Sequence, residues 1–389
     1  MKRSLLVYVV ALLAGAACAC AQQPPAHAQK LPLYKGFPEP DQDGIRTREI
    51  YTPSYHLDRI YKSMEGPVGT QWFNFHDGGE PRLVWLVGYR VEVVGGDGQS
   101  KVPQEYVCHN ILQFHNDAHR EIFQRPDMFR NTQFDWVTRV FTLSQGQYTT
   151  RFPNGFGVPI MSTESLSMTS QVLNLNEEDI DLAIRHKVSI DFILDKDLKK
   201  PLKPLMPYTA SSLVLVDGTN EVYTVEQAGE IQDHAGCSPG LNATQSTLDL
   251  LVEGPNRVVS AHWLVKPGRE ERRTLVTKYL NLPFDTTVHC IAVHLHPFAE
   301  SLSFRDVTAK KTLFTANAKG QDSTPVLLQA KIGLDRIDSY SSEEGIPVYK
   351  DHEYELVSVY DNTSGVDQDA MAVMVLYILD QEYSKPRGI

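Results

Sequence analysis

The sequence predicts an all-β protein made of two tandem, antiparallel, jelly-roll-like β-sandwich domains. Short runs rich in Val, Ile, Leu, Tyr and Phe recur along most of the chain, and segments of turn-forming residues separate them. The composition agrees, because 17 Tyr, 15 Phe, 25 Gly and 23 Pro favour short strands and many turns. At 389 residues the chain is too long for one ordinary core, so two domains are expected.

The N-terminus has the pattern of a secretion signal. Two basic residues precede an apolar run over 5–17, and a site of small residues follows at 19–21. We therefore expect residues 1–21 to be a signal peptide and the mature protein to be exported to the periplasm or the extracellular space. Cys18 and Cys20 leave a lipoprotein anchor open as an alternative. No later run approaches the roughly 18 apolar residues of a membrane span.

An N-terminal sandwich is expected over 46–204, after a leader over 22–45 that is rich in Pro and Gln. We expect this leader to be flexible. The clearest strands of the first sandwich are the apolar runs over 83–94, 106–115 and 188–194.

Helical signals are rare. Asn176 is a suitable N-cap before spaced apolar residues, and it predicts one short helix over 176–184.

Three prolines within 201–207 are incompatible with a central strand, so we place the domain boundary there. The C-terminal sandwich is then expected over 205–389.

The second half repeats the pattern of apolar runs and turns. No P-loop, dinucleotide-binding fingerprint or CxxC pair interrupts it. The predicted strands are 211–216, 248–252, 258–265, 288–295, 301–306, 313–317, 354–360 and 371–379.

The most informative feature is the pair His294 and His296 on the predicted strand 288–295 and its end. Residues at i and i+2 of a strand point to the same face. Two imidazoles on one face can bind one metal ion, and imidazole suits Cu, Zn, Fe and Ni. The alternative is a pair of surface histidines on a half-exposed strand.

Met371 begins another apolar strand near the C-terminus. A methionine on a strand is usually a core residue. Its thioether is also a soft ligand, and a set of two imidazoles and one thioether favours copper, Cu(I) in particular. If the two strands lie side by side, Met371 completes a His2Met site with His294 and His296.

These residues resemble the copper type II, ascorbate-dependent monooxygenases, the family of peptidylglycine alpha-hydroxylating monooxygenase and dopamine beta-monooxygenase. The resemblance covers 205–380 well and 80–195 more loosely. The matching segments, in chain order, are 264–268, the His-x-His strand at 293–296, 349–356, and the Met strand that begins at 369–371.

The resemblance implies a copper centre at His294, His296 and Met371, where O2 and an external reductant such as ascorbate hydroxylate a substrate C–H bond. We expect one copper per chain. The family's second copper site is degenerate here: His109 is kept, Cys108 replaces the adjacent histidine, and Asn176 stands where the third belongs. Cys108 and His109 therefore form a weak second site.

Ala292 takes the place of an arginine that grips a substrate carboxylate in the peptide-hydroxylating members. A C-terminal peptide substrate is therefore not expected, and the substrate, a small molecule or another peptide, stays open. The chain lacks the set of disulfide bonds that is typical of the family, although Cys237 and Cys290 could form one disulfide. His262 is a candidate extra ligand or supporting residue.

Several carboxylates could fix the tautomer of a ligating imidazole: Glu300, Asp306 and Asp369.

An acidic chain, with a net charge of -11 and no basic run, is a poor nucleic-acid binder. Two other functions stay open. One is a non-catalytic exported copper-binding protein for storage, delivery or sensing, and the other is a structural or adhesive protein without metal.

Overall fold

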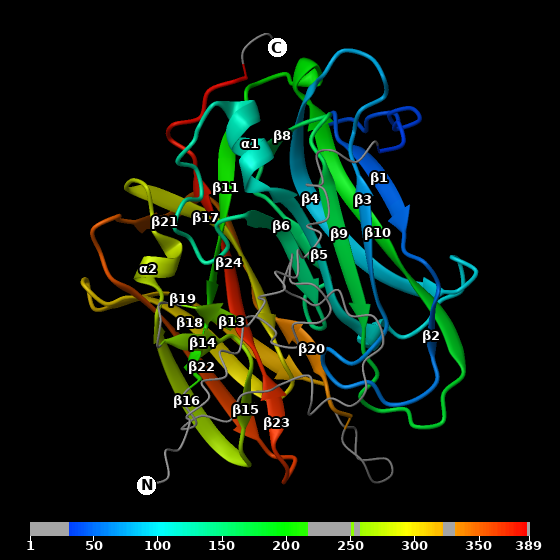
Figure 1. Cartoon of the computed structure of the whole chain (residues 1–389), viewed down its shortest axis with the longest axis vertical. Helices are drawn as coiled ribbons and strands as arrows, with labels where there is room; N and C mark the ends of the chain where they lie inside the picture. The colour runs from blue at the N-terminus through cyan, green and yellow to red at the C-terminus, as the bar shows by residue number, and fades with distance from the viewer. Residues whose placement is uncertain (1–30, 217–249, 253–256, 322–330, 387–389) are drawn as a thin grey trace, which may run out of the picture.

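The computed structural model describes residues 31–216, 250–252, 257–321 and 331–386. Strands dominate these residues, and the α-helices among them are the short α1 (Asn116–Phe123) and α2 (Thr277–Leu280). The predicted all-β fold class is confirmed. In Figure 1 the first half of the chain, blue to green, fills the upper right, and the second half, yellow to red, fills the lower left.

The largest sheet has ten strands and includes strands from both halves of the chain. Its order is β1-β10-β4-β8-β11-β24-β17-β21, with β2 paired to β10 and β7 paired to β4. The strands are β1 (Arg46–Tyr51), β2 (Tyr55–Leu57), β4 (Leu83–Gly95), β7 (Thr149–Arg151), β8 (Phe156–Met161), β10 (Leu182–Leu194), β11 (Lys203–Ser211), β17 (Thr286–Leu295), β21 (Tyr340–Val348) and β24 (Ala372–Leu379).

Smaller sheets accompany the large one. A four-stranded sheet has the order β3-β9-β5-β6, and a five-stranded sheet has the order β16-β22-β18-β19-β20. Two short ladders, β12-β14-β13 and β15-β23, lie in the second half. The strands are β3 (Val68–Phe73), β5 (Val107–His115), β6 (Val137–Ser144), β9 (Leu166–Val172), β12 (Val214–Leu215), β13 (Leu250–Val252), β14 (Val258–Ser260), β15 (Trp263–Val265), β16 (Gly268–Leu275), β18 (Ala299–Asp306), β19 (Lys311–Gly320), β20 (Leu334–Ile337), β22 (Tyr354–Asn362) and β23 (Gln368–Ala370).

One hydrophobic core extends through both halves of the chain. Strand β6 contacts β11, β17 and β24, so the four-stranded sheet packs against the middle of the large sheet. The Tyr377 hydroxyl on β24 donates to the Val140 carbonyl on β6, at 2.8 Å, within this interface. The packing brings β5 of the first half to the same region as β17 of the second.

Most predicted strands are present, including 83–94 as β4 and 106–115 as β5. The predicted helix over 176–184 is wrong. The Asn174 carboxamide oxygen accepts the backbone N–H groups of Asn176 and Glu177, which forms a turn in place of a helix. The chain then enters β10 at Leu182.

The expectation that the prolines of 201–207 exclude a central strand is also wrong. Pro204 and Pro207 lie inside β11, between β8 and β24. Strand β8 pairs with β11 only at Lys203 and Pro204, whereas β24 pairs with β11 from Leu205 onward. Proline has no backbone N–H group to donate to a neighbouring strand. Because β11 changes its partner strand after Pro204, few of its N–H groups are required by both neighbours, and the prolines are therefore tolerated.

Residues 31–45 of the predicted leader contain no strand, but the rings of Tyr34 and Phe37 contact Phe75 and Phe192 on the first sandwich. The predicted signal peptide, the two cysteines within it, and residues 22–30 lie outside the described residues. No helix in the described part of the chain is long and apolar enough to cross a membrane.

Candidate metal centre

The histidine strand and the methionine strand are direct neighbours. Strands β17 and β24 pair antiparallel, with His294 opposite Val373 and Leu295 opposite Ala372. His296 directly follows β17, and Met371 directly precedes β24. The side-by-side arrangement on which the predicted site depends is therefore present in the backbone.

Tyr360 on β22 links these two positions. Its hydroxyl accepts the backbone N–H of His296 at 3.3 Å and donates to the carbonyl of Met371 at 2.6 Å. The ring is fully buried, and burial raises the pKa of the Tyr360 hydroxyl well above its usual value. The hydroxyl thus stays protonated and joins the two chain segments in one fixed arrangement.

Both imidazoles of the pair are buried. His294 is 8% exposed and His296 is 4% exposed, and their rings lie 5.0 Å apart at right angles. Burial first, and then the nearby imidazoles of His296 and His109, lower the pKa of His294 well below its usual value. The His294 ring is therefore neutral at physiological pH, which is the form that binds a metal ion.

Asp369 on β23 lies between two histidines. Its Oδ2 is 2.8 Å from Nδ1 of His296, and its Oδ1 is 3.4 Å from Nδ1 of His262. These three side chains are the one group of three His, Cys, Asp or Glu donors in the described residues whose ligand atoms all lie within 4.8 Å of one another. Of the three carboxylates considered from sequence, Asp369 is at the site.

The other two carboxylates are engaged elsewhere. Glu300 pairs with Arg269 at 3.1 Å, and Asp306 pairs with His352 at 2.7 Å.

The local charges keep the Asp369 carboxylate ionised. Burial by itself would raise its pKa, but attraction to His296 and the hydrogen bond with His262 outweigh burial and hold the pKa of Asp369 well below its usual value. The centre therefore contains a fixed negative charge beside buried imidazoles, which favours a cation.

The first half of the chain contributes Cys108 to the same region. The β5–β9 ladder has a bulge between Val107 and His109, so Cys108 is the bulged residue. Bulges redirect side chains, and this one allows the adjacent Cys108 and His109 to avoid the opposite faces that a regular strand would give them. Cys108 lines the cavity beside His294 and His296, and burial raises the pKa of its thiol to about 12.

Asn176, which stands where the third histidine of a second copper site belongs, has another role. Its side-chain amide donates to the carbonyl of Ile332 at 3.0 Å and accepts the Ile332 N–H at 2.8 Å. Both ends of the carboxamide are thus occupied by the backbone of the other half. Neither Cys108 nor His109 belongs to the group of three converging donors in the described residues.

A cavity of about 280 Å³ adjoins these side chains. Cys108, His294, His296 and Asp369 line one part of it. The rest of its wall combines apolar side chains from both halves of the chain (Ile60, Leu173, Leu175, Leu264, Leu295, Pro297 and Ile332) with polar ones (Lys62, Ser63, Gln145, Asp367 and Gln368). A small molecule with an apolar face would therefore fit next to the imidazoles.

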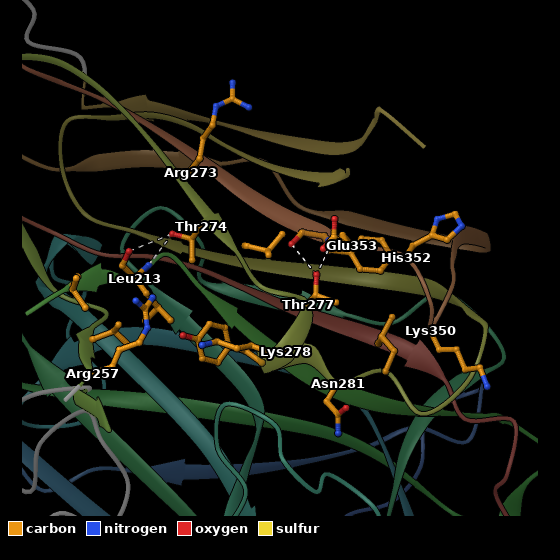
Figure 2. A pocket seen from close by; sticks show the side chains of 16 residues that line it. Leu213, Arg257, Arg273, Thr274, Thr277, Lys278, Asn281, Lys350, His352 and Glu353 are labelled. Carbon is orange, nitrogen blue, oxygen red and sulfur yellow. Dashed lines mark hydrogen bonds between the residues drawn. The ribbon is translucent and has the colours of Figure 1, made fainter. Parts of the chain in front are cut away.

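A larger pocket of about 600 Å³ lies elsewhere, by β16 and β22. Figure 2 shows Arg273 and Lys350 at its opposite ends, pointing outward and not toward a common point. Arg273 is paired with Glu271 and Glu355. The converging donors of the described residues lie at the histidine cluster and not in this pocket, so we place the functional site there.

The buried polar atoms of the cluster fit a metal ion. Nδ1 of His294 is buried without a hydrogen-bond partner, and Nδ1 of His296 and Oδ2 of Asp369 pair with each other at 2.8 Å. Buried polar atoms in native proteins normally have a partner, so the His294 nitrogen calls for an explanation. All three atom types are common ligands of first-row metals.

Cys290 is a buried free thiol four residues before His294. Cys237, with which it could form a bridge, lies outside the described residues.

No protein-family model and no curated protein matches the chain. Two solved structures show limited similarity. One is peptide-N(4)-(N-acetyl-beta-D-glucosaminyl) asparagine amidase, with TM-score 0.31 and 11% identity over 87% of this chain and 98% of that chain. The other is the major capsid protein P2 from bacteriophage PM2, with TM-score 0.28 and 9% identity over 86% of this chain and 100% of that chain. TM-scores this low carry no argument about function, and the resemblance to copper monooxygenases stays a prediction.

Proposed function

We propose that the chain is an exported, copper-dependent monooxygenase-like protein whose copper is held by His294, His296 and Met371. The observation that supports this most is the pairing of the His-x-His strand with the Met strand, joined by the Tyr360 hydroxyl, next to a cavity. Copper, when bound, supplies O2 activation for the hydroxylation of a substrate C–H bond, with electrons from an external reductant such as ascorbate.

The residues of this chain would prepare the centre in two ways. Burial keeps the His294 ring neutral, so it can bind an ion without first losing a proton. The apolar wall, which includes Leu173, Leu264 and Ile332, would hold a small apolar substrate and exclude water from the reacting C–H bond.

A second candidate function is non-catalytic copper binding, for storage, delivery or sensing. The observation that favours it is the loss of two imidazoles where the family places its electron-supplying copper. Cys108 carries a buried, protonated thiol, and the Asn176 side chain is bonded to the Ile332 backbone. A single centre without this partner would bind copper but would lack the usual internal electron route.

Oxygen uptake separates the two functions. The purified protein is loaded with one equivalent of copper, and uptake is followed with ascorbate and a panel of small apolar substrates. Uptake coupled stoichiometrically to hydroxylated product supports the enzyme. Copper bound at one per chain, with no coupled product under any donor, supports the binding protein.

The control is a double variant, His294→Gln with His296→Gln, checked for folding by circular dichroism. Both copper functions predict that this variant loses the bound copper. Unchanged copper content in the folded double variant would rule both out.

A further inference from the structure

Three side chains from separate segments of the second half meet next to the His294–His296 pair. His262 lies between β14 and β15, His296 directly follows β17, and Asp369 lies in β23. One ligand atom of each lies within 4.8 Å of the others. The sites of the proposed copper centre and of this trio share only His296.

The spacing of the trio fits a shared ion. Nitrogen and oxygen ligands bind first-row divalent metals at about 2.0–2.2 Å, so two ligands of one ion stand roughly 3.0–3.5 Å apart. Oδ2 of Asp369 is 2.8 Å from Nδ1 of His296, slightly closer than this spacing, and the other oxygen, Oδ1, is 3.4 Å from Nδ1 of His262, within it. Small movements would place all three donors at bonding distance from one point.

The contacts of the carboxylate support the same conclusion. Oδ2 of Asp369 pairs with Nδ1 of His296 at 2.8 Å, and Oδ1 contacts Nδ1 of His262 at 3.4 Å. A buried carboxylate between two imidazole nitrogens is a set of donors of the types that first-row divalent ions prefer.

The trio is also held in place before any ion binds. Strands β15 and β23 pair with Leu264 opposite Asp369, which sets the carboxylate beside the His262 segment. The His262 backbone is fixed on both sides by Ser260: the Ser260 hydroxyl accepts the His262 N–H at 3.0 Å and donates to the His262 carbonyl at 2.9 Å. Such rigid support is what a metal site needs.

We infer that His262, His296 and Asp369 form a site for a divalent first-row metal ion, a set of two imidazoles and one carboxylate that does not use Met371. This donor set is harder than the His2Met set, and it suits Fe(II), Zn(II) or Co(II) better than Cu(I). The site goes beyond the proposed function, because it needs His262 and Asp369, which the copper centre does not use, and has only His296 in common with that centre.

The test measures binding of Co(II) to the purified full-length chain, by visible absorption and calorimetry, with no substrate present. The two informative variants are His262→Gln and Asp369→Asn, and the matched controls are His294→Gln and Met371→Leu. We expect one bound Co(II), a loss of affinity above about 100-fold in each informative variant, and little change in both controls. The d–d bands of bound Co(II) should be lost in the informative variants alone.

Two results would overturn the inference. Loss of Co(II) in His294→Gln with retention in His262→Gln would assign the ion to the histidine strand only. A loss of just about 10–100-fold in both informative variants, with unchanged d–d bands, would make Asp369 a positioning residue that orients the imidazoles without touching the ion.

Circular dichroism verifies that each variant is folded. If Asp369→Asn does not fold, the comparison of His262→Gln with His294→Gln decides the question alone. Failure of copper-coupled oxygen uptake would leave the Co(II) result unaffected, so the two proposals are distinguishable.

Discussion

Tyr360 provides one hydroxyl that serves two chain segments of the centre. It receives the His296 N–H and donates to the Met371 carbonyl, in a fully buried position. Removing the hydroxyl leaves a buried N–H and a buried carbonyl without this partner, which destabilises the fold by about 1–3 kcal/mol. The cost would fall on the segments that carry the predicted copper ligands.

We therefore predict that Tyr360→Phe lowers the free energy of unfolding of the metal-free protein by about 1–3 kcal/mol, measured by urea denaturation. The control is Tyr340→Phe on β21, a partly buried tyrosine whose ring packs against Phe314. Equal loss in both variants would argue against a special role for the Tyr360 hydroxyl.

Met371 tests the copper assignment most directly. Met371→Leu conserves volume in this buried position and removes only the thioether. Because sulfur is a soft ligand, we predict that the variant weakens Cu(I) binding more than Cu(II) binding. Competition with a Cu(I) chelator and a Cu(II) chelator gives the two affinities, and equal weakening would count against Met371 as a ligand.

Among individual residues, the sequence predicted only part of the candidate metal centre. The i, i+2 spacing pointed to His294 and His296, and the Met strand followed from its apolar pattern. It could not select Asp369 over Glu300, because the choice depends on which strand pairs with β15. That pairing joins residues more than a hundred positions apart, and no local pattern encodes it.

The bulge in β5 has a chemical consequence for Cys108. Its thiol is buried, and burial raises its pKa to about 12, so almost none of it is thiolate at pH 8. We predict that iodoacetamide modifies Cys108 very slowly in the native protein and rapidly in urea. Peptide mapping by mass spectrometry follows this residue separately. Native labelling as fast as that of a small-molecule thiol would contradict the buried position.

Among the elements, regular strands were predictable and the exceptions had local causes. Strand β4 is a long apolar run, and its pattern alone was sufficient. Helix α1 was missed because eight residues are too few for a clear helical period. Its position depends on Arg120, which bonds to Asp117, to the Met128 carbonyl and to Asp135.

The whole molecule should become less stable in mild acid. His186 is fully buried against Ser170 and Tyr55, and burial lowers its pKa to about 4; burial also lowers the pKa of His294. In the unfolded chain both titrate near about 6.5. Below that pH the unfolded state gains protons that the folded state does not, so stability falls as pH falls.

For His186 alone we predict a loss of about 3 kcal/mol as the pH falls from about 6.5 to about 4, with no further loss from this residue below its folded pKa. Urea unfolding of the metal-free protein at several pH values measures it. His186→Gln should flatten the dependence, and an unchanged slope in that variant would refute the assignment.

Strand β11 joins the two halves by pairing with β8 on one side and β24 on the other. Cutting the backbone just before Lys203 would separate the halves covalently yet leave complementary strand edges on the two pieces. Each fragment would thus be a template for the other, and reassembly by strand addition would regenerate the cavity, whose wall comes from both halves. The architecture lends itself to a split reporter in which binding of a small molecule in the cavity reads out the reunion of two polypeptides.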